Sequence, residues 1–426
     1  MANELIEHAI EILRKNDQGT YTVPTHGLYP FQWNWDSALT ALGMGYYDED
    51  RAWVELTTLM DHQWEDGMVP HIIFHKEDEG YFPGPDVWRT DRSLPTSGIT
   101  QPPVSGFAVR RLYERATDKA KAAEQARPLL AKIDAWHDWF YRCRDPHGSG
   151  LVALIHPWES GRDNSVDWDI AFERVPTDGV EPFQRRDLQH ADASHRPTQA
   201  QYERYIYLVQ LFRSLNWDNS KLHDASPFQI VDPGFNGILI RSCADLADLA
   251  EKLGHPEIAA RNRARAEAGV AAMEALWSEA DSQYLCFDRK AGVMIKNASI
   301  AGLLAVFAPI PKNRAEQIGA RLMDMGKQAK YLVPSQPVGS DLYDGKRYWR
   351  GPVWLIVNFM ISNGLARAGQ SDVVDRIVSD SLSLIEKGGF AEYYDPMTGE
   401  PCGGKTFTWT AAMVIEFLSN ADREAA

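Results

Sequence analysis

One eight-residue segment, residues 158–165 with the sequence Trp-Glu-Ser-Gly-Arg-Asp-Asn-Ser, concentrates side chains that can do chemistry. It brings together two carboxylates, a guanidinium, an amide and an indole around a single glycine. Such a density of polar groups in a loop costs free energy unless the groups pair with one another or meet a ligand. A solvated turn with an asparagine cap is the structural alternative, although solvated turns seldom carry tryptophan.

A second carboxylate lies among aromatic residues late in the chain, in Phe-Ala-Glu-Tyr-Tyr-Asp-Pro at residues 390–396. Aromatic neighbours can control both the water around Glu392 and the pKa of its carboxyl group. An ordinary loop with a capping acid is the alternative. Two carboxylate loops indicate glycosidic cleavage, in which one acid protonates the leaving oxygen and a second carboxylate attacks or activates water.

Two further aromatic segments have the composition of sugar-site walls. In Gln-Trp-Asn-Trp-Asp at residues 32–36, Asp36 either caps the following helix or holds a pair of hydroxyls between the two indoles. Residues 343–354 combine arginines with tyrosines and tryptophans, and Pro352 fits the first turn of a helix there. That segment is either a cationic, aromatic pocket wall or a packed corner.

The composition favours a sugar ligand and excludes several other partners. Of 426 residues, 14 are Trp, 16 are Tyr and 16 are Phe, and indole rings stack well on the apolar faces of sugars. The net charge of -15 argues against nucleic acid and against an anionic membrane surface. No apolar stretch has the length of a membrane span, and residues 1–15 lack the pattern of a signal peptide. We therefore expect a cytoplasmic protein.

The sequence contains no recognisable motif for a metal, a cofactor or a nucleophilic serine or cysteine. It has no nucleophile elbow, phosphate-binding loop or dinucleotide glycine motif. The 4 cysteines are far apart and form no zinc pattern, so we expect free thiols in a reducing compartment. His71 and His75 are more often structural than ligands. We predict chemistry without a cofactor and without a metal.

Helical periodicity recurs along the whole chain, with apolar residues three and four positions apart. The predicted helices are residues 4–14, 36–46, 49–63, 105–115, 118–142, 203–215, 233–253, 258–277, 298–307, 314–322, 352–368, 371–387 and 408–418. Short strands are predicted only at residues 68–74, 150–155 and 284–288. Because strands and helices do not alternate, a doubly wound sheet is excluded and we predict an all-α fold.

Aromatic turns that lead into a helix recur at residues 29–36, 348–354 and 405–410. About a dozen helices with such starts predict an (α/α)6 barrel with long loops over a central cavity, and an irregular all-α fold is the alternative. No linker divides the chain, so we predict a single catalytic domain over residues 1–426. Two long irregular stretches interrupt the helices, at residues 80–103 and 187–198, and we expect the first to act as a lid.

Several segments of the chain resemble glycoside hydrolase family 63, and especially its short bacterial branch of mannosylglycerate and glucosylglycerate hydrolases. They are Phe-Gln-Trp-Asn-Trp-Asp-Ser, Trp-Glu-Asp-Gly-Met-Val-Pro-His, the segment at residues 158–165, Tyr-Trp-Arg-Gly-Pro-Val-Trp and Phe-Ala-Glu-Tyr-Tyr-Asp-Pro-Met-Thr-Gly-Glu-Pro. The resemblance runs from Gln32 to Trp409. Residues 1–426 show no pattern of the β-rich N-terminal domain of larger family members, so we expect a small substrate.

The resemblance implies an (α/α)6 barrel and cleavage with inversion, with Asp163 as general acid and Glu392 as general base. Inversion implies a separation of roughly 6.5–9.5 Å between the two carboxyl groups. Arg196, Tyr202 and Tyr81 are expected to hold the carboxylate of the aglycone, and Arg162 is expected to face the ligand or Glu159. The residues that the resemblance assigns to substrate binding are Trp33, Trp35, Asp36, Tyr81, Gln101, Trp158, Gly161, Arg162, Arg196, Tyr202, Tyr348, Trp349, Trp354 and Trp409.

We therefore expect hydrolysis of an α-linked glucosyl or mannosyl glycerate to the free sugar and glycerate. An α-glucosidase for a neutral disaccharide or another small glucoside is the first alternative, because it needs both carboxylates but not Arg196. A sugar epimerase or a sugar-binding protein on the same barrel is a more distant alternative, and such epimerases use histidine bases. The expected partner is a small sugar substrate, and the exposed helices permit assembly into a homo-oligomer.

Overall fold

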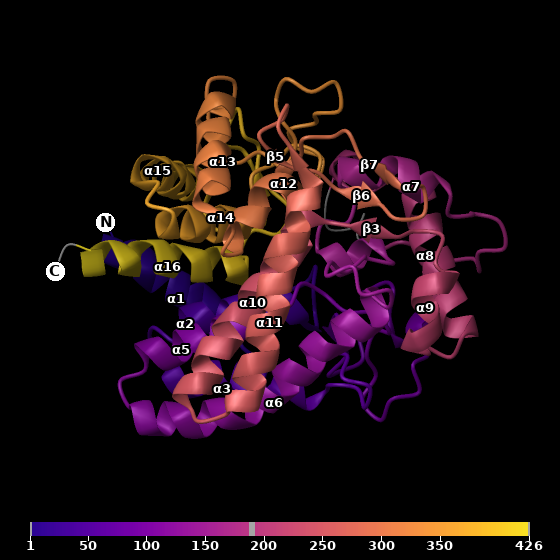
Figure 1. The fold of residues 1–426 in the computed structure, drawn as a ribbon, viewed down its shortest axis with the longest axis horizontal. Helices are drawn as coiled ribbons and strands as arrows, with labels where there is room; N and C mark the ends of the chain where they lie inside the picture. The colour runs from indigo at the N-terminus through magenta and orange to yellow at the C-terminus, as the bar shows by residue number, and fades with distance from the viewer. Residues whose placement is uncertain (1, 187–191, 425–426) are drawn as a thin grey trace.

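Figure 1 shows the computed structural model of the chain, which describes residues 2–186 and 192–424. Residues 187–191, which begin the second predicted irregular stretch, lie outside the described residues. Helices dominate the described part, as predicted, and its strands are two residues long. None of the described helices is both long and apolar enough to cross a bilayer.

Six helices within the described residues form a closed inner ring. They are α2 (Asn34–Met44), α5 (Ser105–Arg115), α10 (Pro233–Lys252), α12 (Ile300–Leu304), α14 (Leu355–Arg367) and α16 (Thr408–Glu424). Each contacts the next one, and α16 returns to contact α2, so the ring closes. A short 3-10 helix, η6 (Ala305–Phe307), extends α12 and packs between α10 and α14.

The inner helices are buried on nearly every side because other helices surround them. Every residue of α2 is buried, and a helix that is apolar or small all round is typical of a core position. Small residues set the spacing between the helices: a Cβ on Gly43 of α2 would lie 2.7 Å from the Cα of Ala412 on α16. Glycine at position 43 therefore lets the first and last inner helices approach closely enough to close the ring.

Six outer helices of the described chain cover the ring. They are α1 (Ala2–Asn16), α3 (Glu49–Asp61), α6 (Lys119–Arg144), α11 (Pro256–Met273), α13 (Lys312–Met325) and α15 (Ser371–Gly388). In chain order, α1 packs on α16, α3 on α2, α6 on α5 and α11 on α10. Both α13 and α15 pack on α14, and α13 also contacts η6. The outer helices are amphipathic: α15 buries Val373, Ile377, Leu384 and Ile385 on one face.

This alternation of inner and outer helices is the predicted (α/α)6 barrel. In Figure 1, α10 and α11 cross the middle of the view as an antiparallel pair. The helices at the two ends of the chain, α1 and α16, lie side by side, because α1 packs directly on α16. The ring thus draws its first and last inner helices from opposite ends of the sequence.

The strands form small antiparallel pairs between the helices. In register, β1 (Gln32–Trp33) pairs with β2 (Ile72–Ile73), β4 (Trp277–Ser278) with β5 (Gln283–Tyr284), and β8 (Tyr393–Tyr394) with β9 (Pro401–Cys402). The strand β6 (Phe287–Asp288) lies between β3 (Ile230–Val231) and β7 (Val293–Met294). The predicted strand at 68–74 therefore contains β2, whereas residues 150–155 contribute only a single bridge between Leu154 and Ile230.

Further helices lie in the connections that lead from an outer helix to the next inner helix. They are α4 (Pro85–Trp88), α7 (Asp169–Glu173), α8 (Gln199–Ser214) and α9 (Asn219–Ala225), with the 3-10 turns η1 (Pro157–Ser160), η2 (Val166–Trp168), η4 (Ala193–His195) and η5 (Glu274–Leu276). Among these, the sequence pattern predicts α8 as a helix in its own right. In Figure 1, α7, α8 and α9 follow one another along the right side, away from the ring.

Several predicted helix starts differ from the observed ones by two to four residues, and two of these starts lie in the aromatic segments. The helix α2 begins at Asn34 with Trp33 as its N-cap, so Asp36 lies inside the first turn and does not cap it. The helix α14 begins at Leu355 after the N-cap Trp354, so Pro352 stays in the preceding loop. Both helices are buried on nearly every side, so the apolar pattern has no single face that marks their first residue. The four cysteines are buried and unpaired, as predicted.

Candidate active site

A pocket opens where the inner helices begin. It encloses about 810 Å³ of space, counting the part that opens to solvent. Its walls come from the first turns of α2 and α16 and from the loops before α5, α8 and α14. The predicted site residues that line it are Trp33, Trp35, Asp36, Tyr81, Gln101, Trp158, Gly161, Asp163, Arg196, Tyr202, Tyr348, Glu392 and Trp409.

Glu392 is held at the bottom of this pocket by three hydrogen-bond donors. Glu392 is 0% exposed and lies in the short loop between α15 and β8. The hydroxyls of Tyr29 and Tyr348 donate to Oε1 at 3.1 and 3.2 Å. The backbone N–H of Gly404 donates to Oε2 at 3.0 Å. Both carboxylate oxygens therefore have fixed partners, which set the orientation of the side chain.

Burial raises the pKa of Glu392 above its ordinary value of 4.5, and four neighbours oppose that shift. The Arg196 guanidinium, the Gly404 N–H and the two tyrosine hydroxyls all favour the ionised form. Asp36 has less compensation, because burial and the nearby charge of Glu392 both hold its pKa well above the ordinary value. Two carboxyl groups of one pocket thus differ in their preference for the proton.

Arg196 places a buried cation beside Glu392. The residue is 5% exposed and follows η4 in the loop that leads into α8. Its Nη1 donates to Tyr29 Oη at 3.2 Å, and its guanidinium lies 4.3 Å from the centre of the Tyr348 ring. Tyr202, in the first turns of α8, lines the same pocket. The predicted arginine and tyrosines therefore do come together.

The loop that carries Asp163 bends sharply against the indole of Trp35. Gly161 has a φ of +68°, which glycine adopts without strain, and a Cβ there would lie 2.6 Å from Trp35 Cζ2. Tyr205 Oη donates to the Asp163 carbonyl oxygen at 2.8 Å. Asp163 itself lines the pocket. The glycine allows the close approach, and the tyrosine fixes the backbone of the acidic residue.

Arg162 does not face the pocket or Glu159, contrary to expectation. Its Nη2 donates to Asp232 at 2.6 Å, and its Nη1 lies 3.5 Å from an Asp167 oxygen. Glu159 is paired instead with Arg144 at 2.7 Å, in a bridge that is equally buried. Arg162 is therefore part of a buried ionic cluster beneath the loop and is not among the residues that line the pocket.

Trp349 and Trp354 also lie behind the pocket wall. Their rings stack on each other at 3.9 Å with an interplanar angle of 2°, and neither lines the pocket. The Tyr348 ring meets Trp354 edge-on at 5.2 Å, and the Trp354 Nε1–H donates to the Tyr348 carbonyl oxygen. The two indoles thus support Tyr348, which is the residue of this motif that reaches the cavity.

The pocket contains residues that sequence reasoning did not assign. Tyr29 and Phe407 come from two of the recurrent aromatic turns, so a signal for them existed. His71, read as more often structural, lines the pocket and stacks on Trp158 at 6.3 Å. Its pKa is lowered by burial and by the nearby His156, so the ring is neutral. Arg186 lines the pocket from a loop that carried no chemical signal.

Part of the stretch at residues 80–103 lines the pocket. Tyr81, Phe82 and Pro83, all within residues 80–103, line the pocket. The Phe82 ring stacks on Phe183 at 5.1 Å with an interplanar angle of 6°. Two loops that are far apart in sequence therefore meet at the pocket wall.

Comparisons with known proteins agree with this geometry. The mannosylglycerate hydrolase MGH1-like glycoside hydrolase domain model matches residues 29–410. The chain is 46% identical over 420 residues to mannosylglycerate hydrolase MGH1 of Selaginella moellendorffii, covering 98% of this chain and 86% of that protein. It is 34% identical over 443 residues to a glucosylglycerate hydrolase of Mycolicibacterium hassiacum, covering 97% and 98%.

A solved structure supports the same assignment. The GH63 mannosylglycerate hydrolase of Thermus thermophilus, in complex with Tris and D-glycerate, superposes with a TM-score of 0.94 and 44% identity. The match covers 97% of this chain and 100% of that one. The chain is therefore a glycoside hydrolase that belongs to the MGH1-like family of GH63 enzymes.

Proposed function

We propose that the chain hydrolyses α-linked mannosyl or glucosyl glycerate to the free sugar and glycerate, with inversion at the anomeric carbon. The observation that carries the proposal is Arg196, a buried cation in the pocket wall beside Glu392. A glycerate aglycone brings a carboxylate that such a cation can bind, whereas a neutral disaccharide does not. Relatives that hydrolyse mannosylglycerate and glucosylglycerate, and a relative solved with D-glycerate, support the same substrate class.

In the proposed mechanism, Asp163 donates its proton to the glycosidic oxygen as the bond to the anomeric carbon breaks. Glu392 accepts a proton from the water that attacks the anomeric carbon from the opposite face. The glycerate leaves with the proton from Asp163, and the sugar gains the hydroxyl from water. A later exchange of protons with solvent returns both carboxyl groups to their starting states.

The surroundings of Glu392 suit a general base. Burial strengthens its affinity for a proton, while Arg196, Gly404 and the two tyrosine hydroxyls favour the ionised form. The three hydrogen bonds also hold the carboxylate in one orientation. This arrangement raises the rate because it orients the base toward a single water molecule.

The sugar is proposed to lie between the indoles of Trp33, Trp35 and Trp158, which line the same pocket. The raised pKa of Asp36 favours a protonated carboxyl, which can donate one hydrogen bond to a sugar hydroxyl and accept another. Gln101 accepts a hydrogen bond from the Trp35 backbone N–H at 3.3 Å, so its amide is anchored to α2.

Residues 80–103 are proposed to act as a lid over a single catalytic domain. The stacking of Phe82 on Phe183 anchors one end of this stretch beside Tyr81, which lines the pocket. Closure excludes water other than the nucleophile from the reacting centre.

The decisive test compares Arg196→Ala with the parent on three substrates: mannosylglycerate, glucosylglycerate and a neutral α-linked disaccharide. Removing a buried partner of a carboxylate costs about 2 kcal/mol or more, which is about a 30-fold loss of kcat/KM for the glycerate substrates. The neutral disaccharide loses less, so the ratio of kcat/KM values falls. Equal small losses on all three substrates would favour the α-glucosidase alternative.

The matched control for Arg196→Ala is Arg174→Ala. Arg174 forms an ion pair with Asp288 at 2.7 Å and does not line the pocket. The same truncation there leaves the substrate ratio unchanged.

We also propose that the protein works in the cytoplasm and that copies of it self-associate. The four buried thiols fit a reducing compartment, and cell fractionation tests this location. Analytical ultracentrifugation tests the association, for which the exposed faces of the outer helices leave room.

A further inference from the structure

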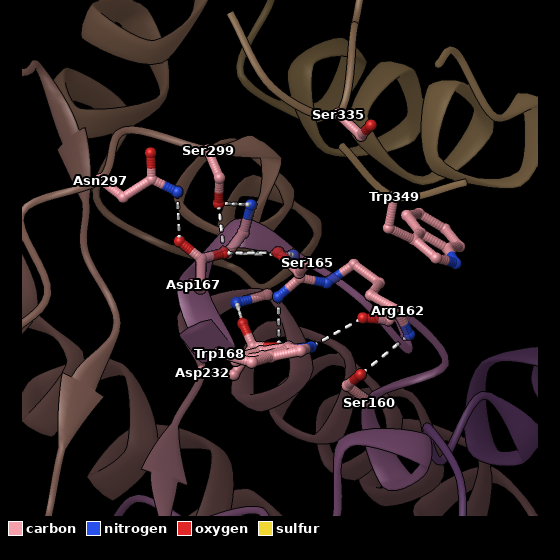
Figure 2. Close-up of polar contacts among 12 residues, drawn as sticks. Ser160, Arg162, Ser165, Asp167, Trp168, Asp232, Asn297, Ser299, Ser335 and Trp349 are labelled. Carbon is pink, nitrogen blue, oxygen red and sulfur yellow. Dashed lines mark hydrogen bonds and ion pairs between the residues drawn. The ribbon is translucent and has the colours of Figure 1, made fainter. Parts of the chain in front are cut away.

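We propose that Arg162 is a positioning residue for the proton donor, because its buried cluster with Asp232 and Asp167 fixes the loop that carries Asp163. The inference rests on the proposed function, in which Asp163 is the general acid. Figure 2 shows the cluster and the residues around it. Arg162 immediately precedes Asp163 in the chain, so the backbone that Arg162 anchors is the backbone from which the acid projects.

The guanidinium of Arg162 is enclosed and fully engaged. Its side chain is 2% exposed, and the Asp232 and Asp167 side chains that face it are 1% and 0% exposed. Its Nη2 donates to Asp232 Oδ2 at 2.6 Å, and its Nη1 donates to Ser165 Oγ at 3.3 Å. The plane of the guanidinium also lies over the Trp168 ring, 5.0 Å from its centre. The side chain therefore has one available position.

Each carboxylate of the cluster is itself tied to the start of an inner helix. Asp232 is the N-cap of α10 and accepts the backbone N–H of Gly234 at 2.9 Å. Asp167 accepts hydrogen bonds from Ser299 Oγ at 2.5 Å and from Asn297 Nδ2 at 2.7 Å. Ser299 is in turn the N-cap of α12. The cluster thus connects the acid loop to two neighbouring helices of the ring (Figure 2).

The backbone around Asp163 is fixed on both sides. The Arg162 N–H donates to Ser160 Oγ at 2.8 Å, and its carbonyl accepts from Trp168 Nε1 at 2.7 Å. The Asp163 carbonyl accepts from Tyr205 Oη. Figure 2 shows Arg162 extending from the loop toward Asp232, with Trp168 and Ser160 bonded to its main chain. With the main chain held at these points, the position of the Asp163 carboxyl depends on where the Arg162 anchor sits.

A purely stabilising role explains the cluster poorly. Buried ion pairs contribute little net stability compared with apolar residues of the same volume, because desolvation offsets the attraction. What such a cluster provides is a defined geometry. A displacement of a catalytic group by about 1 Å costs on the order of 100-fold in rate, so an anchor under the proton donor has a direct kinetic consequence.

The test separates proton donation from every other step by changing the leaving group. A glycerate glycoside needs a proton on its leaving oxygen, whereas the fluoride of an α-glycosyl fluoride departs without one. Arg162→Lys keeps the charge but loses the two-pronged geometry. We expect its kcat on mannosylglycerate to fall about 10- to 100-fold, with KM changed by less than about 3-fold and with turnover of α-mannosyl fluoride nearly unchanged.

Two reference variants make the result interpretable. Arg241→Lys alters another buried arginine, paired with Asp245 at 2.6 Å on α10 away from the acid loop, and it leaves both substrates unaffected. Asp163→Asn removes the proton itself and shows the same selective loss as Arg162→Lys, but larger. If Asp163→Asn also loses turnover of α-mannosyl fluoride, both the role of Asp163 as the acid and this inference are wrong. If only Arg162→Lys loses turnover of α-mannosyl fluoride, the positioning role of Arg162 alone is wrong.

Thermal melting accompanies each assay. An Arg162→Lys variant that loses activity equally on both substrates contradicts the positioning role, whatever its melting temperature. If that variant does not fold, Ser299→Ala replaces it, because it removes one hydrogen bond to Asp167 together with the side-chain cap that accepts the Ala301 N–H at the start of α12. The expected pattern is the same, at a factor of about 3 to 10, in line with one hydrogen bond of about 1 kcal/mol.

Discussion

The hydroxyl of Tyr29 is the contact whose removal has the most specific consequence for the base. It donates to Glu392 Oε1 at 3.1 Å, accepts from Arg196 Nη1 at 3.2 Å and lies 3.1 Å from the Tyr348 hydroxyl. Changing Tyr29 to Phe removes these three contacts and leaves the ring in place against Trp33 and Phe407. The shape of the pocket is therefore kept while its electrostatics change.

The expected size of the effect follows from the surviving contacts. A hydrogen bond to a charged group contributes about 1.5–3 kcal/mol, and Tyr348 still donates to the same Glu392 oxygen in the variant. The lower end of that range applies, so kcat/KM falls about 10-fold at the pH optimum. The Tyr29 hydrogen bond is one of the contacts that lower the pKa of Glu392 against burial. Its loss raises that pKa further, and the acidic limb of the pH profile moves to higher pH.

The assay is kcat/KM for mannosylglycerate as a function of pH, in the parent and in Tyr29→Phe. Tyr284→Phe is the control, because Tyr284 also donates to a carboxylate, Glu274, at 3.0 Å, but outside the pocket. The control keeps the parent profile. An acidic limb that stays in place or moves to lower pH in Tyr29→Phe refutes the reasoning about Glu392.

Three further variants test the site from other directions. Glu392→Gln abolishes turnover, yet it is more stable than the parent at neutral pH by about 0.5–2 kcal/mol. The raised pKa of Glu392 sets the sign of this difference. The protonated carboxyl contributes its full stability at a pH below the pKa that Glu392 has in the unfolded chain, and this contribution is lost as the pH rises through its pKa in the folded protein. Melting curves from pH 4 to 7 therefore diverge as the pH rises, and curves that converge contradict this. Gly161→Ala loses about 1–3 kcal/mol of stability and most of its activity, because φ is +68° and the added Cβ meets Trp35. An unchanged melting temperature of this variant contradicts the prediction. Phe82→Ala loses the stack on Phe183, so KM for mannosylglycerate rises about 2- to 12-fold while kcat changes little; a fall in kcat at constant KM argues against a lid.

Sequence periodicity places helix ends closely in both layers of the barrel, and it predicts the inner helix α5 (Ser105–Arg115) to the residue. The prediction of residues 371–387 differs from α15 (Ser371–Gly388) by one residue, because that helix alternates buried and exposed faces. The inner helix α14 starts three residues later than predicted, at Leu355, because it is buried nearly all round. Short helices such as α7, with five residues, lack the length to show a period at all.

The sequence also indicates which segments meet in the pocket, but it does not indicate where each side chain points. Arg162 and Asp163 are adjacent, yet Asp163 lines the pocket while Arg162 turns to Asp232, 70 positions away. Trp349 and Trp354 stack on each other behind the pocket wall. Only the folded ring brings Asp232 to Arg162, so no local pattern in the sequence records that contact.

The most direct measurement is proton NMR of the sugar released from mannosylglycerate in the first minutes of turnover. Inversion with Asp163 as acid and Glu392 as base predicts that β-mannose appears first and that the α anomer grows in later by mutarotation. Initial release of α-mannose, or no release from either glycerate substrate, would contradict the proposed function.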